Sequence, residues 1–241
     1  MDAAGLVAGA PWLGFTPRGD DHPVMVLPGF GADDASTLPL RNFLDQRGYR
    51  ARGWNQGINL GVRRMGGYDQ LLARLLDIHR TSRKTVSLVG WSLGGIHARA
   101  IAKLAPEAVR QVISLGSPIG GPLERTALWR LYENMNGATI DRSVIDRIVN
   151  ANRQPPPVPS TAIYSRLDGV VPWQIARERA TGATAPIDNI EVFASHIGLG
   201  THAAVYYVLA DRLALDVDEW QPFAPPLWAR ACFGELTSEA A

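Results

Sequence analysis

The segment Gly90-Trp91-Ser92-Leu93-Gly94 could carry a nucleophilic serine. Mostly apolar residues precede it at 86–89, and a helix-like apolar stripe follows it. This is the G-x-S-x-G pattern in its strand–turn–helix setting, in which a sharp turn lifts the serine side chain clear of a sheet. The start of the following helix would point its backbone N–H groups at whatever Ser92 attacks. The segment therefore predicts a serine positioned to attack a carbonyl carbon.

A serine hydroxyl needs a histidine base, and it needs a carboxylate that holds this histidine in the right tautomer. After an elbow of this kind the acid comes first along the chain, and the histidine follows it. Asp168 is the candidate acid, because it follows the predicted strand 161–164 and so emerges at the same sheet edge as Ser92. The alternative interpretation of Asp168 is a turn-forming Asp-Gly pair. Asp188 precedes the predicted strand 190–193, which puts it at the opposite edge.

His196 is the candidate base, because it directly follows the predicted strand 190–193. Its rival, His202, falls in the first turn of the predicted final helix, where a capping or supporting role is the alternative. His97 lies on the helix after Ser92 and is expected to be a packing residue. His22 and His79 precede the elbow and are out of order for this arrangement.

An attacking serine also needs two N–H donors for the oxyanion that forms. Leu93 is one candidate, because it directly follows the serine. Phe30 is the other, since it lies in Pro28-Gly29-Phe30-Gly31 after an early strand, and Gly29 lets the backbone bend there. Pro28 has no N–H group. The alternative interpretation is a plain glycine-rich turn, and the loop lacks the patterns of a dinucleotide or Walker phosphate site.

Strand-like apolar runs alternate with helix-like patterns along the chain. The predicted strands are 24–27, 49–54, 85–89, 112–115, 161–164 and 190–193, and the predicted helices lie within 33–46, 71–79, 93–104 and 201–215. This alternation favours an α/β fold with a mainly parallel sheet covered on both faces.

The segment 119–159 is longer than a single crossover needs, and two amphipathic patterns in it predict a small helical cap. We expect the cap to line a substrate pocket with Trp91, Trp129 and Trp173 as candidate walls, although ordinary core packing is the alternative for these tryptophans. Residues 1–22 are expected to form an N-terminal arm, 23–118 and 160–215 the core, and 216–241 a Pro-rich tail over the surface.

Composition excludes several functional classes. The net charge is +1 without a basic stripe, which gives no support for nucleic acid as a partner. A single cysteine, Cys232, allows no internal disulfide and fits no metal spacing. The serine, histidine and carboxylate chemistry described above implies no metal or organic cofactor. No window approaches 18 uninterrupted apolar residues, and the first residues lack a basic n-region, so a soluble cytoplasmic protein is expected. The oligomeric state is left open.

The chain resembles the α/β-hydrolase superfamily of serine esterases and lipases, in particular a bacterial branch related to the small lidless bacterial lipases. The resemblance covers about residues 22–222 and rests on Val89–Gly95, Gly116-Ser117-Pro118, Ser165–Trp173 and Ser195-His196-Ile197-Gly198-Leu199. It implies that His196 is the catalytic histidine and that Phe30 serves the oxyanion. Pro28 stands where those lipases carry a histidine, and the cap segment departs from the lidless relatives.

The hypothesis is carboxylic ester hydrolysis through an acyl-enzyme, of the carboxylesterase and lipase type. Ser92 would attack, His196 would move the proton, Asp168 would orient His196, and Phe30 and Leu93 would hold the oxyanion. Acyl transfer or thioester cleavage by the same groups is the alternative, and a non-catalytic binding protein on the same fold is a further one. The sequence does not identify the acyl group or the alcohol.

Overall fold

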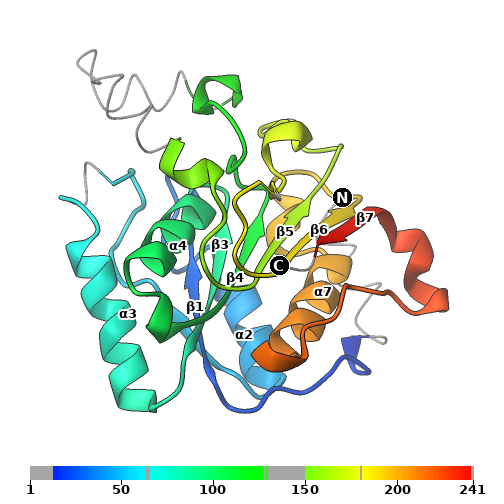
Figure 1. Ribbon diagram of the computed structural model, residues 1–241. Coiled ribbons are helices and arrows are strands. Elements are labelled where there is room, and N and C mark those ends of the chain that lie inside the picture. Colours follow the sequence, from blue (N-terminus) through cyan, green and yellow to red (C-terminus); the bar gives the residue numbers. More distant parts are fainter. Residues whose placement is uncertain (1–12, 63–65, 128, 130–149, 180, 240–241) are drawn as a thin grey trace.

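The computed structural model describes residues 13–62, 66–127, 129, 150–179 and 181–239. Within these ranges, seven strands form one sheet in the order β2-β1-β3-β4-β5-β6-β7 (Figure 1). All neighbouring strands pair in parallel except β6 and β7, which are antiparallel. The strands are β1 (Pro23–Leu27), β2 (Arg50–Gly53), β3 (Val86–Trp91), β4 (Val109–Leu115), β5 (Ser160–Tyr164), β6 (Ile187–Val192) and β7 (Phe233–Glu239).

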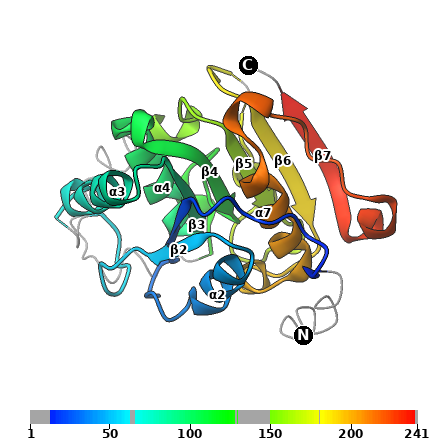
Figure 2. The same ribbon diagram turned by 90° about the horizontal axis from the view of Figure 1, so that it is seen from below.

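Helices cover both faces of the sheet (Figure 2). One face carries α3 (Asp69–Ser82) and α4 (Leu93–Leu104), and the other carries α2 (Leu38–Gln46) and α7 (Ala203–Ala214). Met25 and Leu27 of β1 pack into the apolar cluster beneath α3 and α4, whereas Val24 and Val26 pack into the apolar cluster beneath α2 and α7. A strand that is buried on both faces needs apolar residues throughout, which explains the continuous run in β1. The predicted mainly parallel α/β architecture is confirmed.

Short 3₁₀ turns join these elements: η1 (Pro106–Ala108), η2 (Leu123–Arg125), η3 (Trp173–Ile175), η4 (Gly198–Gly200), η5 (Val217–Glu219) and η6 (Leu227–Cys232). Helix α2 begins at Leu38, later than predicted, because residues 33–37 form turns instead. The carboxylate of Asp34 in these turns accepts hydrogen bonds from the backbone N–H groups of Trp54 and Asn55. It therefore ties the residues before α2 to the end of β2.

The prediction of a tail that only covers the surface was wrong for its last part. Phe233–Glu239 forms β7, which extends the sheet beside β6. Arg166 and Arg177 both form ion pairs with Glu235 of β7, at 2.8 and 3.3 Å. The strand depends on pairing with β6 and on these distant arginines, which local sequence pattern does not reveal.

Most of the expected cap lies outside the described residues. The first expected amphipathic helix starts with the 3₁₀ turn η2, after which Thr126 is extended. The rest of that helix, apart from Ala127 and Trp129, and the second helix fall in the undescribed part of 119–159. The base of the segment is attached firmly, because the buried Arg99 of α4 donates to the carbonyl oxygens of Asn152 and Gln154 and pairs with the buried Glu178.

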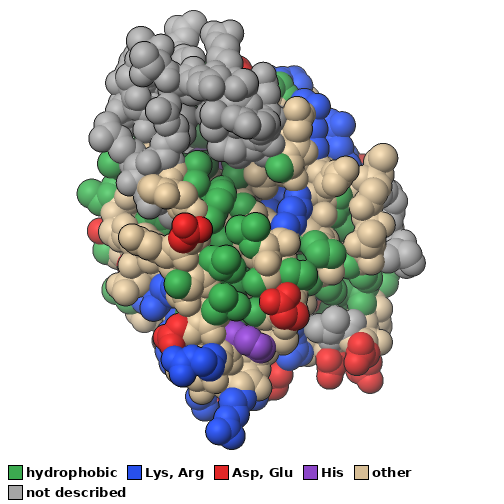
Figure 3. All heavy atoms as spheres, turned by 60° about the vertical axis from the view of Figure 1, so that its left-hand side comes forward, with side chains coloured by type: hydrophobic (Ala, Val, Ile, Leu, Met, Phe, Trp, Pro, Cys, Tyr) green, Lys and Arg blue, Asp and Glu red, His purple; other side chains and the backbone are tan. Residues whose placement is uncertain are grey.

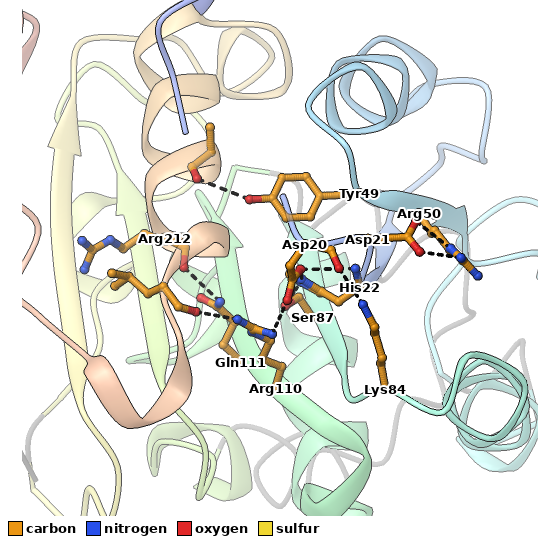
Figure 4. Close-up of polar contacts among 12 residues, drawn as sticks. Asp20, Asp21, His22, Tyr49, Arg50, Lys84, Ser87, Arg110, Gln111 and Arg212 are labelled. Carbon is orange, nitrogen blue, oxygen red and sulfur yellow. Dashed lines mark hydrogen bonds and ion pairs between the residues drawn. The ribbon is translucent and has the colours of Figure 1, made fainter. Parts of the chain in front are cut away.

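A chain of polar contacts through the buried His22 holds the segment before β1 against the sheet (Figure 4). His22 is 0% exposed, and its Nε2 lies 2.9 Å from Oγ of Ser87 in β3. Its Nδ1 bonds to the carboxylate of Asp20, which also pairs with Arg110 of β4 at 3.0 Å. Burial lowers the pKa of His22. Although burial opposes the shift, the hydrogen bond from His22 lowers the pKa of Asp20 to about 2.

The outer side of α3 and α4 is partly apolar. Leu76 of α3 and Leu104 of α4 are 40% and 58% exposed. Figure 3, which views the molecule from this side, shows hydrophobic side chains gathered at the middle of the face and charged side chains mainly around them. In the part of the chain that is described, no helix has both the length and the apolar character needed to cross a membrane.

Candidate active site

Ser92 occupies the turn between β3 and α4, at the edge where the parallel strands end. Its backbone has φ 54° and ψ −119°, a conformation that a residue with a side chain rarely adopts. Close backbone packing forces this turn: a Cβ on Gly90 would lie 2.4 Å from Cα of Gly95, and one on Gly94 would lie 2.3 Å from the carbonyl oxygen of Leu27. Two glycines are therefore required for the helix to cross so near the strands.

Ser92, His196 and Asp168 form one hydrogen-bonded chain. Oγ of Ser92 lies 3.0 Å from Nε2 of His196, and Nδ1 of His196 lies 2.7 Å from Oδ2 of Asp168. With Nδ1–H donating to the carboxylate, Nε2 is the acceptor that faces the serine hydroxyl. The sequence placed these residues on three separate loops, and the loops after β3, β5 and β6 bring them together.

Asp168 is held in place by its own loop. Oδ1 accepts from the backbone N–H groups of Val170 and Val171 at 2.8 and 2.9 Å, which leaves Oδ2 for His196. Gly116, with φ 52°, lies against this pair, since a Cβ there would be 2.9 Å from Oδ2 of Asp168. The carboxylate side chain is 1% exposed, so it is shielded from solvent.

The loop after β6 orients His196. The indole N–H of Trp91 donates to the carbonyl oxygen of His196 at 3.1 Å, and the backbone N–H of Gly198 donates to Oγ of Ser195. His202 does not reach Ser92. Instead it is the N-cap of α7, where its Nδ1 accepts from the backbone N–H of Ala204 at 3.2 Å.

The loop after β1 passes beside Ser92. A Cβ on Gly29 would come within 3.4 Å of Cβ of Ser92, so the next residue, Phe30, lies next to the serine. Leu93 begins α4, and an N–H in the first turn of a helix has no acceptor within the helix. Both residues line the cavity beside Ser92. The arrangement can present two backbone N–H groups to a developing negative charge.

A cavity of about 70 Å³ adjoins Ser92. The lining is mostly apolar, and none of the described side chains in it is charged at neutral pH. The apolar members are Phe30, Val62, Leu93, Ile96, Pro118, Leu123, Trp129, Val170 and Val171, and the polar ones are Ser92, Tyr68, His97 and Thr126.

The three candidate tryptophans lie in different surroundings. Trp129 lines the cavity. Trp91 packs beside His196, with ring centroids 6.4 Å apart. Trp173 lies elsewhere, stacked on Tyr164 and covered by the guanidinium of Arg166 at 4.5 Å. Only Trp129 of the three is in a position to touch a group in the cavity.

Two other residues differ from their sequence-based description. His97 is more than a packing residue, since it lines the cavity and its ring nitrogens contact Asn59 and Tyr68. Asp188 lies inside β6 rather than before it, because β6 begins at Ile187. It stays at the edge away from Ser92, where it pairs with the buried Arg212 at 2.7 Å, and burial raises its pKa.

Among the described residues, no group of three or more His, Cys, Asp or Glu side chains is arranged to hold a metal ion. The groups that the site brings together are the serine hydroxyl, the imidazole, the carboxylate and the backbone N–H groups beside them.

No family model and no curated protein matches the chain. Solved structures do match it. Lipase B from Aspergillus fumigatus aligns with a TM-score of 0.62 and 17% identity over 82% of this chain and 53% of that chain, so the present chain spans about half its length. The mouse alpha/beta hydrolase domain-containing protein 10 aligns with a TM-score of 0.57 and 19% identity over 80% of this chain and 88% of that one.

A bacterial enzyme gives the same result. Lipase BlEst2 from Bacillus licheniformis aligns with a TM-score of 0.57 and 16% identity, covering 83% of this chain and 94% of that chain. At identities this low, a structural match is evidence about the architecture alone. The sheet order and the two helical layers described above agree with it. The chain has the α/β-hydrolase fold.

Proposed function

We propose that this protein is a serine hydrolase that cleaves carboxylic esters through an acyl-enzyme intermediate. The observation that carries the proposal is the hydrogen-bonded chain from Ser92 through His196 to Asp168, at 3.0 and 2.7 Å. The lipases among the structural neighbours support the same reaction class.

In the first half of the reaction, Ser92 Oγ attacks the ester carbonyl while Nε2 of His196 takes its proton. Asp168 stabilises the imidazolium that forms, and the N–H groups of Phe30 and Leu93 bind the oxyanion. The tetrahedral intermediate collapses as His196 protonates the departing alcohol. Water then attacks the acyl-serine while His196 takes its proton, and His196 returns that proton to Oγ of Ser92 as the acyl–oxygen bond breaks and the acid is released.

The lining of the cavity favours a neutral, apolar group next to the reacting carbonyl. A charged acyl group would lose its hydration without meeting a charged partner among the described lining residues, which is costly. We assign Trp129 a role in holding this group. Trp129→Ala is expected to shift the chain-length preference across a series of p-nitrophenyl esters, whereas Trp173→Ala, outside the cavity, is expected to leave it unchanged.

The central test is covalent labelling of Ser92 by a fluorophosphonate probe, together with turnover of p-nitrophenyl esters. Wild type is expected to label and turn over, and Ser92→Ala to do neither. His196→Ala should lose activity while His202→Ala, its matched control, keeps it. Wild-type turnover retained in Ser92→Ala would refute the proposal. A purely binding protein would neither label nor turn over, and an acyltransferase would form mainly transfer product when an alcohol competes with water.

A further inference from the structure

We propose that Asn59 is a positioning residue for the oxyanion loop, defined here as residues 28–32. The inference rests on the proposed function and deepens it by assigning a role to the loop between β2 and α3. Asn59 is 0% exposed, and it contacts the oxyanion loop through both its side chain and its backbone.

Three hydrogen bonds from Asn59 bracket Phe30. The side-chain Nδ2 donates to the carbonyl oxygen of Pro28 at 2.8 Å. The backbone carbonyl of Asn59 accepts from Gly31 N–H, and its backbone N–H donates to the carbonyl of Ala32, each at 2.8 Å. The contacts fall on both sides of the Gly29–Phe30 peptide, so they determine where the N–H of Phe30 points.

The orientation of the Asn59 carboxamide is itself fixed. Oδ1 accepts from the backbone N–H of Gly61 at 3.1 Å and lies 3.2 Å from Nε2 of His97. Nδ1 of His97 lies 3.3 Å from the hydroxyl of Tyr68. Because the carboxamide oxygen can only accept, His97 must donate from Nε2 and accept the Tyr68 proton at Nδ1.

The environment keeps His97 in this neutral tautomer. The ring is 1% exposed, and burial lowers its pKa to about 4. Trp54 stacks on it, with centroids 6.4 Å apart and planes at 16°. The hydroxyl of Tyr68, the imidazole of His97 and the carboxamide of Asn59 thus form one directional chain that ends at the oxyanion loop.

Loss of the Asn59 carboxamide should harm the transition state more than substrate binding. The carbonyl of Pro28 would lose its donor, and the Gly29–Phe30 peptide would gain freedom to rotate, while the apolar cavity that holds the substrate would remain. Removal of a whole oxyanion donor costs about 10²–10³ in kcat. A donor that is present but poorly aimed should cost less, and we expect a drop of about 10–100-fold in kcat with KM changed less than about 3-fold.

The experiment compares wild type, Asn59→Ala and a control, Asn189→Ala. Asn189 is also a buried asparagine with side-chain hydrogen bonds to backbone, but it lies in β6 and contacts Glu178 rather than the oxyanion loop. We measure kcat, KM and the affinity for a trifluoromethyl ketone, which forms an oxyanion with the serine. For Asn59→Ala the ketone affinity should fall in parallel with kcat/KM, whereas Asn189→Ala should change neither.

Asn59→Asp serves as a second, nearly isosteric variant if Asn59→Ala does not fold. A protonated carboxyl group can donate to Pro28 but an ionised one cannot, so its kcat relative to wild type should rise as the pH falls. His97 and Tyr68 are the titratable groups that face this position.

The outcomes separate the two proposals. Wild type that neither labels nor turns over would refute the proposed function. Wild type that turns over, with Asn59 variants whose kcat and ketone affinity stay within about 3-fold of it, would overturn the role of Asn59 alone. A loss that appears only in KM would overturn it as well.

Discussion

Replacing Ser92 with glycine should leave the protein more stable than replacing it with alanine, although both changes remove the hydroxyl. The backbone at Ser92 has φ 54° and ψ −119°, which crowds the Cβ of any L residue. Alanine keeps that Cβ and glycine does not. Both variants lose the hydrogen bond to His196, so this term cancels in the comparison.

The expected difference follows from two opposing terms. A residue held in such a sparsely populated region costs about 1–3 kcal/mol, which glycine avoids. Glycine has more conformational freedom in the unfolded chain, which lowers its stability relative to alanine by about 0.5–1 kcal/mol. The net advantage of Ser92→Gly is therefore about 1 kcal/mol, or about 2–4 °C in Tm for a chain of this size.

Chemical denaturation of both variants at the same pH measures this difference. The control is the same pair of changes at Ser114, a buried residue inside β4 without a positive φ. There alanine should be the more stable of the two, because the unfolded-chain entropy and the lost packing of a buried Cβ both disfavour glycine. If Ser92→Gly were also less stable than Ser92→Ala by about 0.5–1 kcal/mol, the elbow would carry no strain and the reasoning would be refuted.

Three further changes test other parts of the structure. Gly116→Ala should lower kcat about 100-fold in an esterase assay, because its Cβ would displace the Asp168 carboxylate that is hydrogen-bonded to His196; unchanged kcat would contradict the proposed role of this pair. Burial lowers the pKa of His97 from 6.5 in the unfolded chain to about 4 in the folded protein. The free energy of unfolding should therefore be greatest above pH 6.5 and should decrease by about 3 kcal/mol as the pH falls to 4. Denaturant unfolding across this pH range should show a smaller loss of unfolding free energy for His97→Gln than for wild type. An equal loss in the two proteins would argue against a neutral buried ring. Arg99→Met should destabilise the fold by about 3–5 kcal/mol by leaving Glu178 buried without its partner. The double variant with Glu178→Met should recover much of the loss in the same assay, and strictly additive losses would show that the pair is not coupled.

The features predictable from sequence were those set by local pattern. Ser92 follows a buried strand and precedes a helix, and the chain order of acid and histidine favours Asp168 and His196 from the sequence alone. Parallel strands end at one edge of the sheet, so residues in the loops after these strands must gather there. This rule needs neither distances nor side-chain packing.

Features that depend on distant partners were not predictable. β7 has a weak pattern of its own and forms because β6 presents an unpaired edge. Asn59 is by sequence one polar residue in a loop with several glycines, and the role proposed for it depends on contacts with Pro28 and His97 in other parts of the chain. Trp173 cannot be distinguished from Trp129 by residue type. The structure distinguishes them, because Trp173 packs against Tyr164 and Arg166 whereas Trp129 lines the cavity.

Ser87, at the beginning of β3, belongs to a second serine–histidine–aspartate chain. His22 and Asp20 follow it in the same bonding order in which His196 and Asp168 follow Ser92 at the end of the strand. Ser87 is 0% exposed, so no ester carbonyl could approach it, whereas Ser92 lines a cavity. The two serines have the same bonding pattern and differ in whether a substrate could reach the oxygen: Ser87 joins the segment before β1 to the sheet, and Ser92 is the serine that we propose to react.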